Sequence, residues 1–197
     1  MSADEGLNRR HFLTVATTAI GGVGVALTAV PFLASWKPSA RAQAAGAPVE
    51  VDISKLEDGG LLRVEWRGKP VWIVKRTSAM LDRLANATND LRDPESDVSD
   101  QPEYAKNEVR SLKPEILVLV ANCTHLGCVP TDRFEVAPAD LGADWVGGFF
   151  CPCHGSKFDL AGRVFAGVPA PTNLSVPPYR FLSDNTILVG DDSGAEA

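Results

Sequence analysis

The sequence predicts a mainly β protein: an antiparallel β-sandwich head carried behind one N-terminal transmembrane α-helix. Three observations predict this class. Residues 12–36 carry no formal charge. Short alternating or β-branched runs begin at Val49 and recur as far as Val189. The head between them, residues 49–191, is long enough to bury one sandwich core.

The first segment, residues 1–36, combines an export signal with an apolar span. The twin-arginine export pattern is matched by Asn8-Arg9-Arg10-His11-Phe12-Leu13, and this route carries folded proteins. The uncharged stretch has about 25 residues, enough to cross a bilayer core as a helix. A plain membrane helix that starts with two arginines would also satisfy the positive-inside rule. The Phe-Leu context favours export.

The next segment, residues 37–48, is a linker of small side chains with a proline near each end. Short alanine-rich segments exchange between extended and helical forms at low cost. Within the linker, Ala40-Arg41-Ala42 resembles a signal-peptidase site, where cleavage would release a soluble head. Because the apolar stretch is longer than a usual signal sequence, we expect it to remain as an anchor.

Strands account for most of the head. They are expected at residues 49–53, 62–66, 71–74, 116–121, 145–150, 175–180 and 186–189. Residues 78–91 break this pattern and predict a helix capped by Ser78, because apolar side chains recur at helical spacing: Met80, Leu81, Leu84, Thr88 and Leu91. Residues 92–113 are polar and should wrap the surface as a loop with a little helix. The acidic tail, residues 192–197, is expected to fray.

All four cysteines and two of the three histidines fall in two short blocks. These are Cys123-Thr-His125-Leu-Gly-Cys128 and Cys151-Pro-Cys153-His154-Gly-Ser156. Expected strands lead into both blocks. The residue types and spacing indicate a metal centre with two thiolate and two imidazole ligands, and two further thiols that can pair.

Zinc is one candidate for this centre, because it takes thiolate and imidazole in this ratio. Zinc sites, however, usually place like ligands together along the chain. Here each block mixes one ligand cysteine with one histidine and leaves a spare cysteine, Cys128 or Cys153. A two-iron cluster fits the mixed blocks better, with the cysteines on one iron and the histidines on the other. The spare cysteines would then join the two loops through a disulfide.

Both blocks, CTHLGC and CPCHGS, resemble the cluster-binding loops of the Rieske iron–sulfur proteins. Over almost the whole chain the sequence is similar to the Rieske subunits of bacterial ubiquinol–cytochrome c reductase. The export signal, the apolar segment and the linker contribute to this similarity, as do Leu91-Arg-Asp-Pro94, Lys113-Pro-Glu115 and Gly167-Val-Pro-Ala-Pro171. The resemblance implies a Rieske-type sandwich head with a small cluster-binding subdomain.

The resemblance also implies one [2Fe-2S] cluster per chain and assigns its protein contacts. The ligands would be Cys123, His125, Cys151 and His154, and Cys128 would form a disulfide with Cys153. His154 would hydrogen-bond the quinol and accept its proton.

Further positions matched by the resemblance would tune and shield the cluster. Ser156 would donate its hydroxyl to a cluster sulfide. Mitochondrial members carry a tyrosine two residues later, which bonds a ligand sulfur. This chain has Phe158 there, so we expect its cluster to have a lower reduction potential than the clusters of members that carry the tyrosine. An apolar collar around the histidine edges would consist of Leu126, Gly127, Pro169 and Pro171.

The implied activity is that of an electron-transfer subunit in an oxidoreductase complex. It would oxidise ubiquinol by coupled proton and electron transfer and pass the electron to a membrane-bound c-type cytochrome. Cytochrome b and membrane lipid would be neighbours, and the complex would be a dimer. The N-terminus would be cytoplasmic and the head periplasmic, on the bacterial inner membrane.

Two other Rieske classes are alternatives to the quinol enzyme. The small subunit of a periplasmic molybdenum oxidase, such as an arsenite oxidase, shares the export signal, the loops and the disulfide. The retained anchor favours the quinol enzyme. The spare cysteine pair argues against an oxygenase-type ferredoxin. The formal net charge of −6 argues against nucleic acid as a partner.

Overall fold

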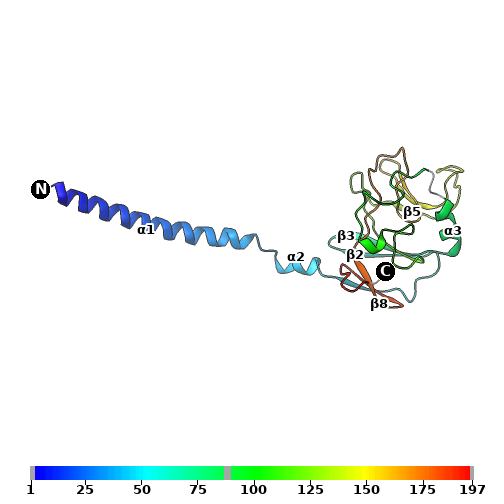
Figure 1. Ribbon diagram of the computed structural model, residues 1–197, viewed down its shortest axis with the longest axis horizontal. Helices are drawn as coiled ribbons and strands as arrows, with labels where there is room; N and C mark the ends of the chain where they lie inside the picture. The colour runs from blue at the N-terminus through cyan, green and yellow to red at the C-terminus, as the bar shows by residue number, and fades with distance from the viewer. Residues whose placement is uncertain (1–2, 87–89, 196–197) are drawn as a thin grey trace. The chain divides into compact units, whose positions relative to one another are not determined.

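The computed structural model describes residues 3–86 and 90–195. Their contacts divide them into an N-terminal unit that ends at Ala44 and a head that begins at Ala45. Figure 1 shows the first unit as helical and the head as mostly strands and loops. The mainly β class with one long N-terminal helix is therefore confirmed.

The N-terminal unit is built on α1, Ala3–Ser35, which is long and apolar enough to cross a membrane by length and composition. Threonine hydroxyls in this helix donate to carbonyls one turn earlier. Such bonds satisfy hydroxyls that lipid could not pair. The three bonds, of 2.7 to 2.8 Å, are Thr14 to Arg10, Thr17 to Leu13 and Thr28 to Gly24.

A short helix, α2, lies within the segment expected to be a linker. It spans Ala40–Ala45. Ser39 precedes it and accepts two backbone N–H groups, from Gln43 at its carbonyl (2.9 Å) and from Ala42 at its hydroxyl (3.2 Å). This cap accounts for the helical form, which an alanine-rich segment adopts at little cost.

Three antiparallel sheets of three strands each make up the described head. The first sheet has the order β1 (Val49–Asp52), β9 (Thr186–Val189) and β8 (Tyr179–Ser183). The second has the order β2 (Leu61–Trp66), β3 (Lys69–Lys75) and β4 (Ile116–Val120). The third has the order β5 (Thr131–Arg133), β6 (Gly148–Cys151) and β7 (Ser156–Phe158). The three-residue strands β5 and β7 have no counterpart among the expected strands, because they are too short to show a period.

The second sheet supplies the centre of the core. All five residues of β4 are buried, as are the four from Val71 to Val74 in β3. Trp72 of β3 stacks on Phe149 of β6 with ring centroids 5.1 Å apart. Phe134 meets the same Phe149 ring edge-on at 5.7 Å. The Trp72–Phe149 contact joins the third sheet, a small subdomain, to the second, whereas Phe134 follows β5 and packs within the subdomain. In Figure 1, β5 lies apart from β2, β3 and β8.

The one helix of the head that the sequence predicts is α3, Ser78–Asn86. Thr77 caps it rather than Ser78, because the Thr77 hydroxyl accepts the Met80 N–H at 3.2 Å. The helix does not reach the expected end at Leu91, which instead forms an antiparallel bridge with Phe165. Strand-like pairing thus replaces the last predicted turn, and Thr88 lies outside the described residues.

The polar loop of residues 92–113 contains one 3-10 turn, η2, Glu103–Ala105. Tyr104 in this turn exchanges two hydrogen bonds with the backbone of Tyr179 on β8, at 2.8 and 2.7 Å. The Tyr179 hydroxyl accepts the Leu112 N–H at 2.9 Å. Two tyrosines therefore fasten the loop to the first sheet, in agreement with the predicted surface wrap with little helix.

Candidate metal centre

Two loops of similar construction carry the cysteine and histidine blocks. The first, residues 123–128, follows β4, and the second joins β6 to β7. Each closes on itself when a glycine N–H donates to the carbonyl of the first cysteine: Gly127 to Cys123 at 2.8 Å and Gly155 to Cys151 at 2.9 Å. Both glycines have positive φ, of 82° and 77°, so the turns that present the histidines depend on glycine.

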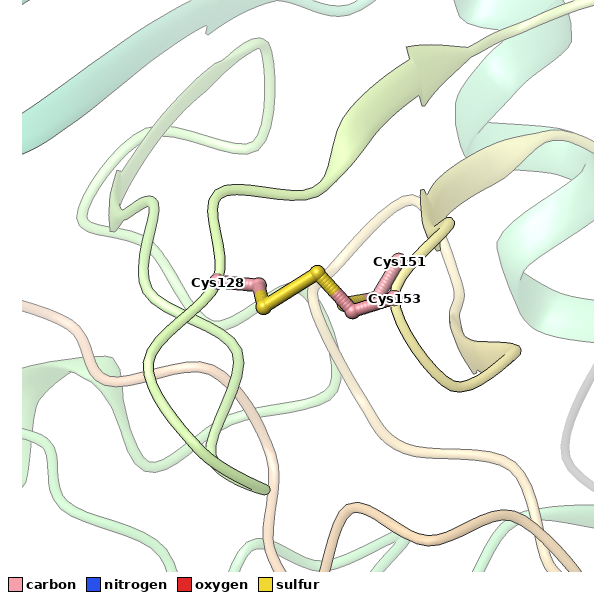
Figure 2. A group of neighbouring side chains, drawn as sticks. All are labelled: Cys128, Cys151 and Cys153. Carbon is pink, nitrogen blue, oxygen red and sulfur yellow. A yellow bond between two sulfur atoms is a disulfide. The ribbon is translucent and has the colours of Figure 1, made fainter.

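A disulfide between Cys128 and Cys153 joins the two loops, as predicted. Figure 2 shows it spanning the gap between them, with Cys151 on the same loop as Cys153. The Cys151 sulfur lies within 4.8 Å of both disulfide sulfurs. Since Cys128 and Cys153 are bonded to each other, they provide no thiolate for a metal. The remaining thiols must do so.

The two remaining thiols, Cys123 and Cys151, are both free and buried, with exposed fractions of 3% and 1%. Burial raises the pKa of the Cys151 thiol, and the neighbouring Cys123 thiol raises it further. A buried thiolate pair without a cation would be unstable for both reasons. A metal at this point would supply the missing positive charge and displace the protons.

The two imidazoles of the blocks contact each other. The ring centroids of His125 and His154 are 4.6 Å apart and the rings are nearly perpendicular, at 87°. His154 is exposed, whereas His125 is half-buried. The Nδ1 atom of His125 is itself buried and has no hydrogen-bond partner. A buried imidazole nitrogen without a hydrogen-bond partner has the chemistry of a metal ligand.

The proline loop, residues 167–171, lies against the second block. Ser156 is fully buried and accepts the Ala170 N–H at its hydroxyl oxygen, at 3.1 Å. Thr124 of the first block donates to the Thr172 carbonyl at 2.6 Å. The expected collar residues Leu126, Gly127, Pro169 and Pro171 are all exposed.

Comparison with known proteins decides the family. Residues 49–179 match the family described as "Rieske [2Fe-2S] domain", and residues 1–39 match "Ubiquitinol-cytochrome C reductase Fe-S subunit TAT signal". The chain is 60% identical to the "Ubiquinol-cytochrome c reductase iron-sulfur subunit" of Allochromatium vinosum, over 99% of this chain and 95% of that one. The chain belongs to the Rieske iron–sulfur subunits of ubiquinol–cytochrome c reductase.

Two further proteins are similar to the chain along most of their length. The Rieske subunit of the same name from Blastochloris viridis is 45% identical over 92% of each chain. A solved chain from "Hyperthermophilic respiratory Complex III" is similar at 26% identity, covering 88% of this chain and 98% of that one, with a TM-score of 0.46. The names of the two sequence relatives favour the reductase class, an oxidoreductase, over the molybdenum oxidase.

The donor set of this Rieske head suits its [2Fe-2S] cluster. Two free buried thiols and two imidazoles in contact with each other match the mixed ligands of such a cluster, and the buried Nδ1 of His125 has no hydrogen-bond partner that would compete for it. A cluster held by four thiolates would need the two cysteines that the disulfide consumes.

Sequence reasoning missed a buried charge cluster beneath the second loop of the Rieske head. Asp159 and Arg163 form an ion pair of 2.7 Å with exposed fractions of 1% and 2%. Arg76 and Arg110 are also buried and donate to the carbonyls of Leu160 and Ala161, each at 3.1 Å. Only the Asp-x-x-x-Arg spacing was visible in the sequence, and it is usual on exposed helices. This ion pair and these two hydrogen bonds tie residues 159–163, which follow β7, to Arg76 and Arg110.

Proposed function

We propose that this chain takes electrons from ubiquinol within a cytochrome bc complex and delivers them to a membrane-bound c-type cytochrome. The observation that carries the proposal is the exposed ring of His154 in contact with the half-buried ring of His125, in two loops whose free thiols are buried. An exposed imidazole next to a redox centre can both contact a substrate hydroxyl and take its proton.

The ligands in this proposal are Cys123 and Cys151 on one iron and His125 and His154 on the other. The bound cluster supplies one-electron chemistry at high potential, because neutral imidazoles leave it less negative than four thiolates would. Burial of both cysteines keeps water from their sulfurs. The disulfide keeps the loops together around them.

His154 binds the quinol hydroxyl and accepts its proton as the electron leaves the quinol. His125 is less suited to this contact, because it is half-buried. The exposed collar of Leu126, Gly127, Pro169 and Pro171 would meet an apolar quinone site and exclude water from it. Ser156 would donate its hydroxyl to a cluster sulfide and stabilise the reduced state.

The N-terminal unit would anchor the head and allow it to move. Arg9 and Arg10 would keep the start of α1 on the cytoplasmic side, placing the head in the periplasm. Residues 37–48 would let the head pass between cytochrome b and the c-type cytochrome, in a dimeric complex. The lipid-facing surface of α1 consists largely of exposed apolar side chains.

The proposal is tested by electron paramagnetic resonance of ascorbate-reduced membranes, with and without a quinol-site inhibitor. We expect a rhombic signal with an average g below the free-electron value, and a change of its shape when the inhibitor binds. The same signal without any response to the inhibitor would contradict quinol contact. No signal under any reductant would contradict the cluster.

A matched pair of variants sharpens this test. Leu126→Ala removes an exposed apolar side chain from the collar, and Leu182→Ala removes one from β8. Leu126→Ala should keep the signal but weaken the response to the inhibitor, whereas Leu182→Ala should alter neither. Equal behaviour of the two variants would count against the collar.

A further inference from the structure

The proline loop has few backbone N–H groups with which to form hydrogen bonds to the rest of the head. Pro169 and Pro171 lack an N–H, so the Ala170 N–H is the only backbone donor from residue 169 to residue 171. That donor is spent on the hydroxyl oxygen of Ser156, 3.1 Å away, where both residues are fully buried. The loop must therefore be oriented by side chains from elsewhere.

Arg92 supplies this support from a distant part of the chain. Its Nη1 donates to the Ala170 carbonyl at 3.0 Å and its Nη2 to the Val168 carbonyl at 3.1 Å. Its own backbone N–H donates to the Val164 carbonyl at 2.9 Å, which fixes the base of the side chain beside the loop. One guanidinium thus donates hydrogen bonds to two loop carbonyls at once. Its planar arrangement of N–H donors makes this possible.

The two carbonyls that accept from Arg92 lie on either side of the peptide group that carries the Ala170 N–H. One belongs to the Val168–Pro169 peptide and the other to the Ala170–Pro171 peptide. Fixing both neighbours leaves the Pro169–Ala170 peptide little freedom to rotate. Arg92 therefore determines where the Ala170 N–H points, and it points at Ser156.

The Ser156 hydroxyl has one proton to donate and can accept at its oxygen. The Ala170 N–H occupies an acceptor position, and within residues 3–86 and 90–195 no protein atom accepts the hydroxyl proton. The proton is therefore directed away from Ala170 and remains available to the cluster site. Loss of the Ala170 contact would free the hydroxyl to rotate.

We propose that Arg92 is a positioning residue for the Ser156 hydroxyl, and that it sets the reduction potential of the centre without touching it. The proposal rests on the donation from Ser156 to the cluster proposed above. Arg92 is exposed, so its replacement should leave the head folded.

The test compares midpoint potentials in the intact membrane complex, by redox titration of the cluster signal. The variants are Arg92→Met, Arg92→Lys, Ser156→Ala and the double variant Arg92→Met/Ser156→Ala. The control is Arg180→Met, which removes a partly exposed arginine whose partner is Asp191, at 3.3 Å. Hydrogen exchange of the Ala170 amide in each variant gives a second readout that does not depend on activity.

We expect Arg92→Met to lower the potential by part of the shift that Ser156→Ala causes, and Arg180→Met to leave it unchanged. The double variant should match Ser156→Ala, because Arg92 acts through the serine. Ala170 exchange should accelerate by at least about tenfold in Arg92→Met, since the two guanidinium hydrogen bonds that hold the neighbouring carbonyls are lost. Arg92→Lys should resemble Arg92→Met, because a single ammonium cannot grip both carbonyls in the same way.

Other outcomes overturn the inference in distinguishable ways. A normal potential in Arg92→Lys, or an undiminished Arg92→Met shift in the Ser156→Ala background, would show that Arg92 acts through its charge alone. A normal potential in Arg92→Met with a lowered one in Ser156→Ala would remove the role of Arg92 and leave that of Ser156. An unchanged potential in Ser156→Ala would remove both.

Discussion

The polar atoms of His125 and Ser156 are used to different extents, which agrees with the roles proposed for them, a metal ligand for His125 and a hydrogen-bond donor for Ser156. His125 keeps Nδ1 buried without a partner, whereas the Ser156 oxygen already accepts the Ala170 N–H. A buried unpaired nitrogen costs free energy that a metal bond would recover. A buried hydroxyl that already accepts one bond needs only a single acceptor for its proton.

Phe158→Tyr should raise the reduction potential of the cluster. Ser156 and Phe158 are two residues apart on β7, so their side chains point to the same face of the strand. A hydroxyl at position 158 could bond a ligand sulfur and stabilise the reduced state. One hydrogen bond corresponds to roughly 20–60 mV for one electron. Redox titration measures the shift, and an unchanged or lowered potential would refute it.

Asp159→Asn should destabilise the head strongly. The substitution removes the only carboxylate in direct contact with the buried Arg163 guanidinium among the described residues. Breaking a buried ion pair costs about 3–5 kcal/mol, which would be seen as a lower denaturant midpoint of the holoprotein. Asp140→Asn is the control, because Asp140 is 61% exposed in its pair with Arg133 and should have little effect. Equal midpoints for the two variants would contradict the prediction.

At the scale of elements, a disulfide joins the two loops that carry the cysteine and histidine blocks. It joins residues separated by 25 positions, which stabilises the fold by about 3.5 kcal/mol in the chain-entropy account. The variant Cys128→Ala/Cys153→Ala should therefore lose its cluster signal at lower denaturant concentration than the parent. Identical denaturation curves would mean that the loops hold together without the bond.

The tyrosine pair that fastens the 92–113 loop to β8 should make the chain sensitive to alkali. Burial raises the pKa of Tyr104 to about 12 and also raises the pKa of Tyr179. Unfolded tyrosine ionises near 10, so the unfolded chain loses protons first as the pH increases. The contribution of the pair to stability is complete below about pH 10 and is lost as the pH rises through about 12.

Tyrosinate absorbance measures this effect directly, because the chain contains two tyrosines in all. The absorbance should appear near pH 12 together with the loss of circular dichroism. Tyr104→Phe should halve its amplitude. Ionisation of both groups near pH 10 in a folded head would contradict the burial of the pair.

At the scale of the whole molecule, the presence of a cluster determines which export route the head can use. A cluster inserted in the cytoplasm requires a route that carries folded proteins, which the twin-arginine motif provides. Arg9→Lys/Arg10→Lys should leave the head on the cytoplasmic side, where protease added to spheroplasts cannot reach it. Arg41→Lys in the linker is the control and should be exported normally. Export of the double variant would indicate another route.

The features of the site that could be predicted from the sequence are those contained within short segments of the chain. The cysteine and histidine blocks reveal their donor set because ligand type and spacing are properties of short segments. The strands leading into the blocks are visible for the same reason, as alternation or apolar runs of a few residues. The end of α3 was predicted wrongly, since Leu91 pairs with Phe165 and a distant partner overrides helical spacing.

The apolar N-terminal helix, the β class of the head and the Cys128–Cys153 disulfide could all be predicted from short segments of the sequence. Only the tertiary structure decided which side chains support them. Arg92 reaches carbonyls 76 and 78 residues away, and Arg76 reaches one 84 residues away. An arginine that pairs with backbone carbonyls leaves no signature in its own segment, because every residue offers the same acceptor. Folding alone brings those carbonyls within its reach.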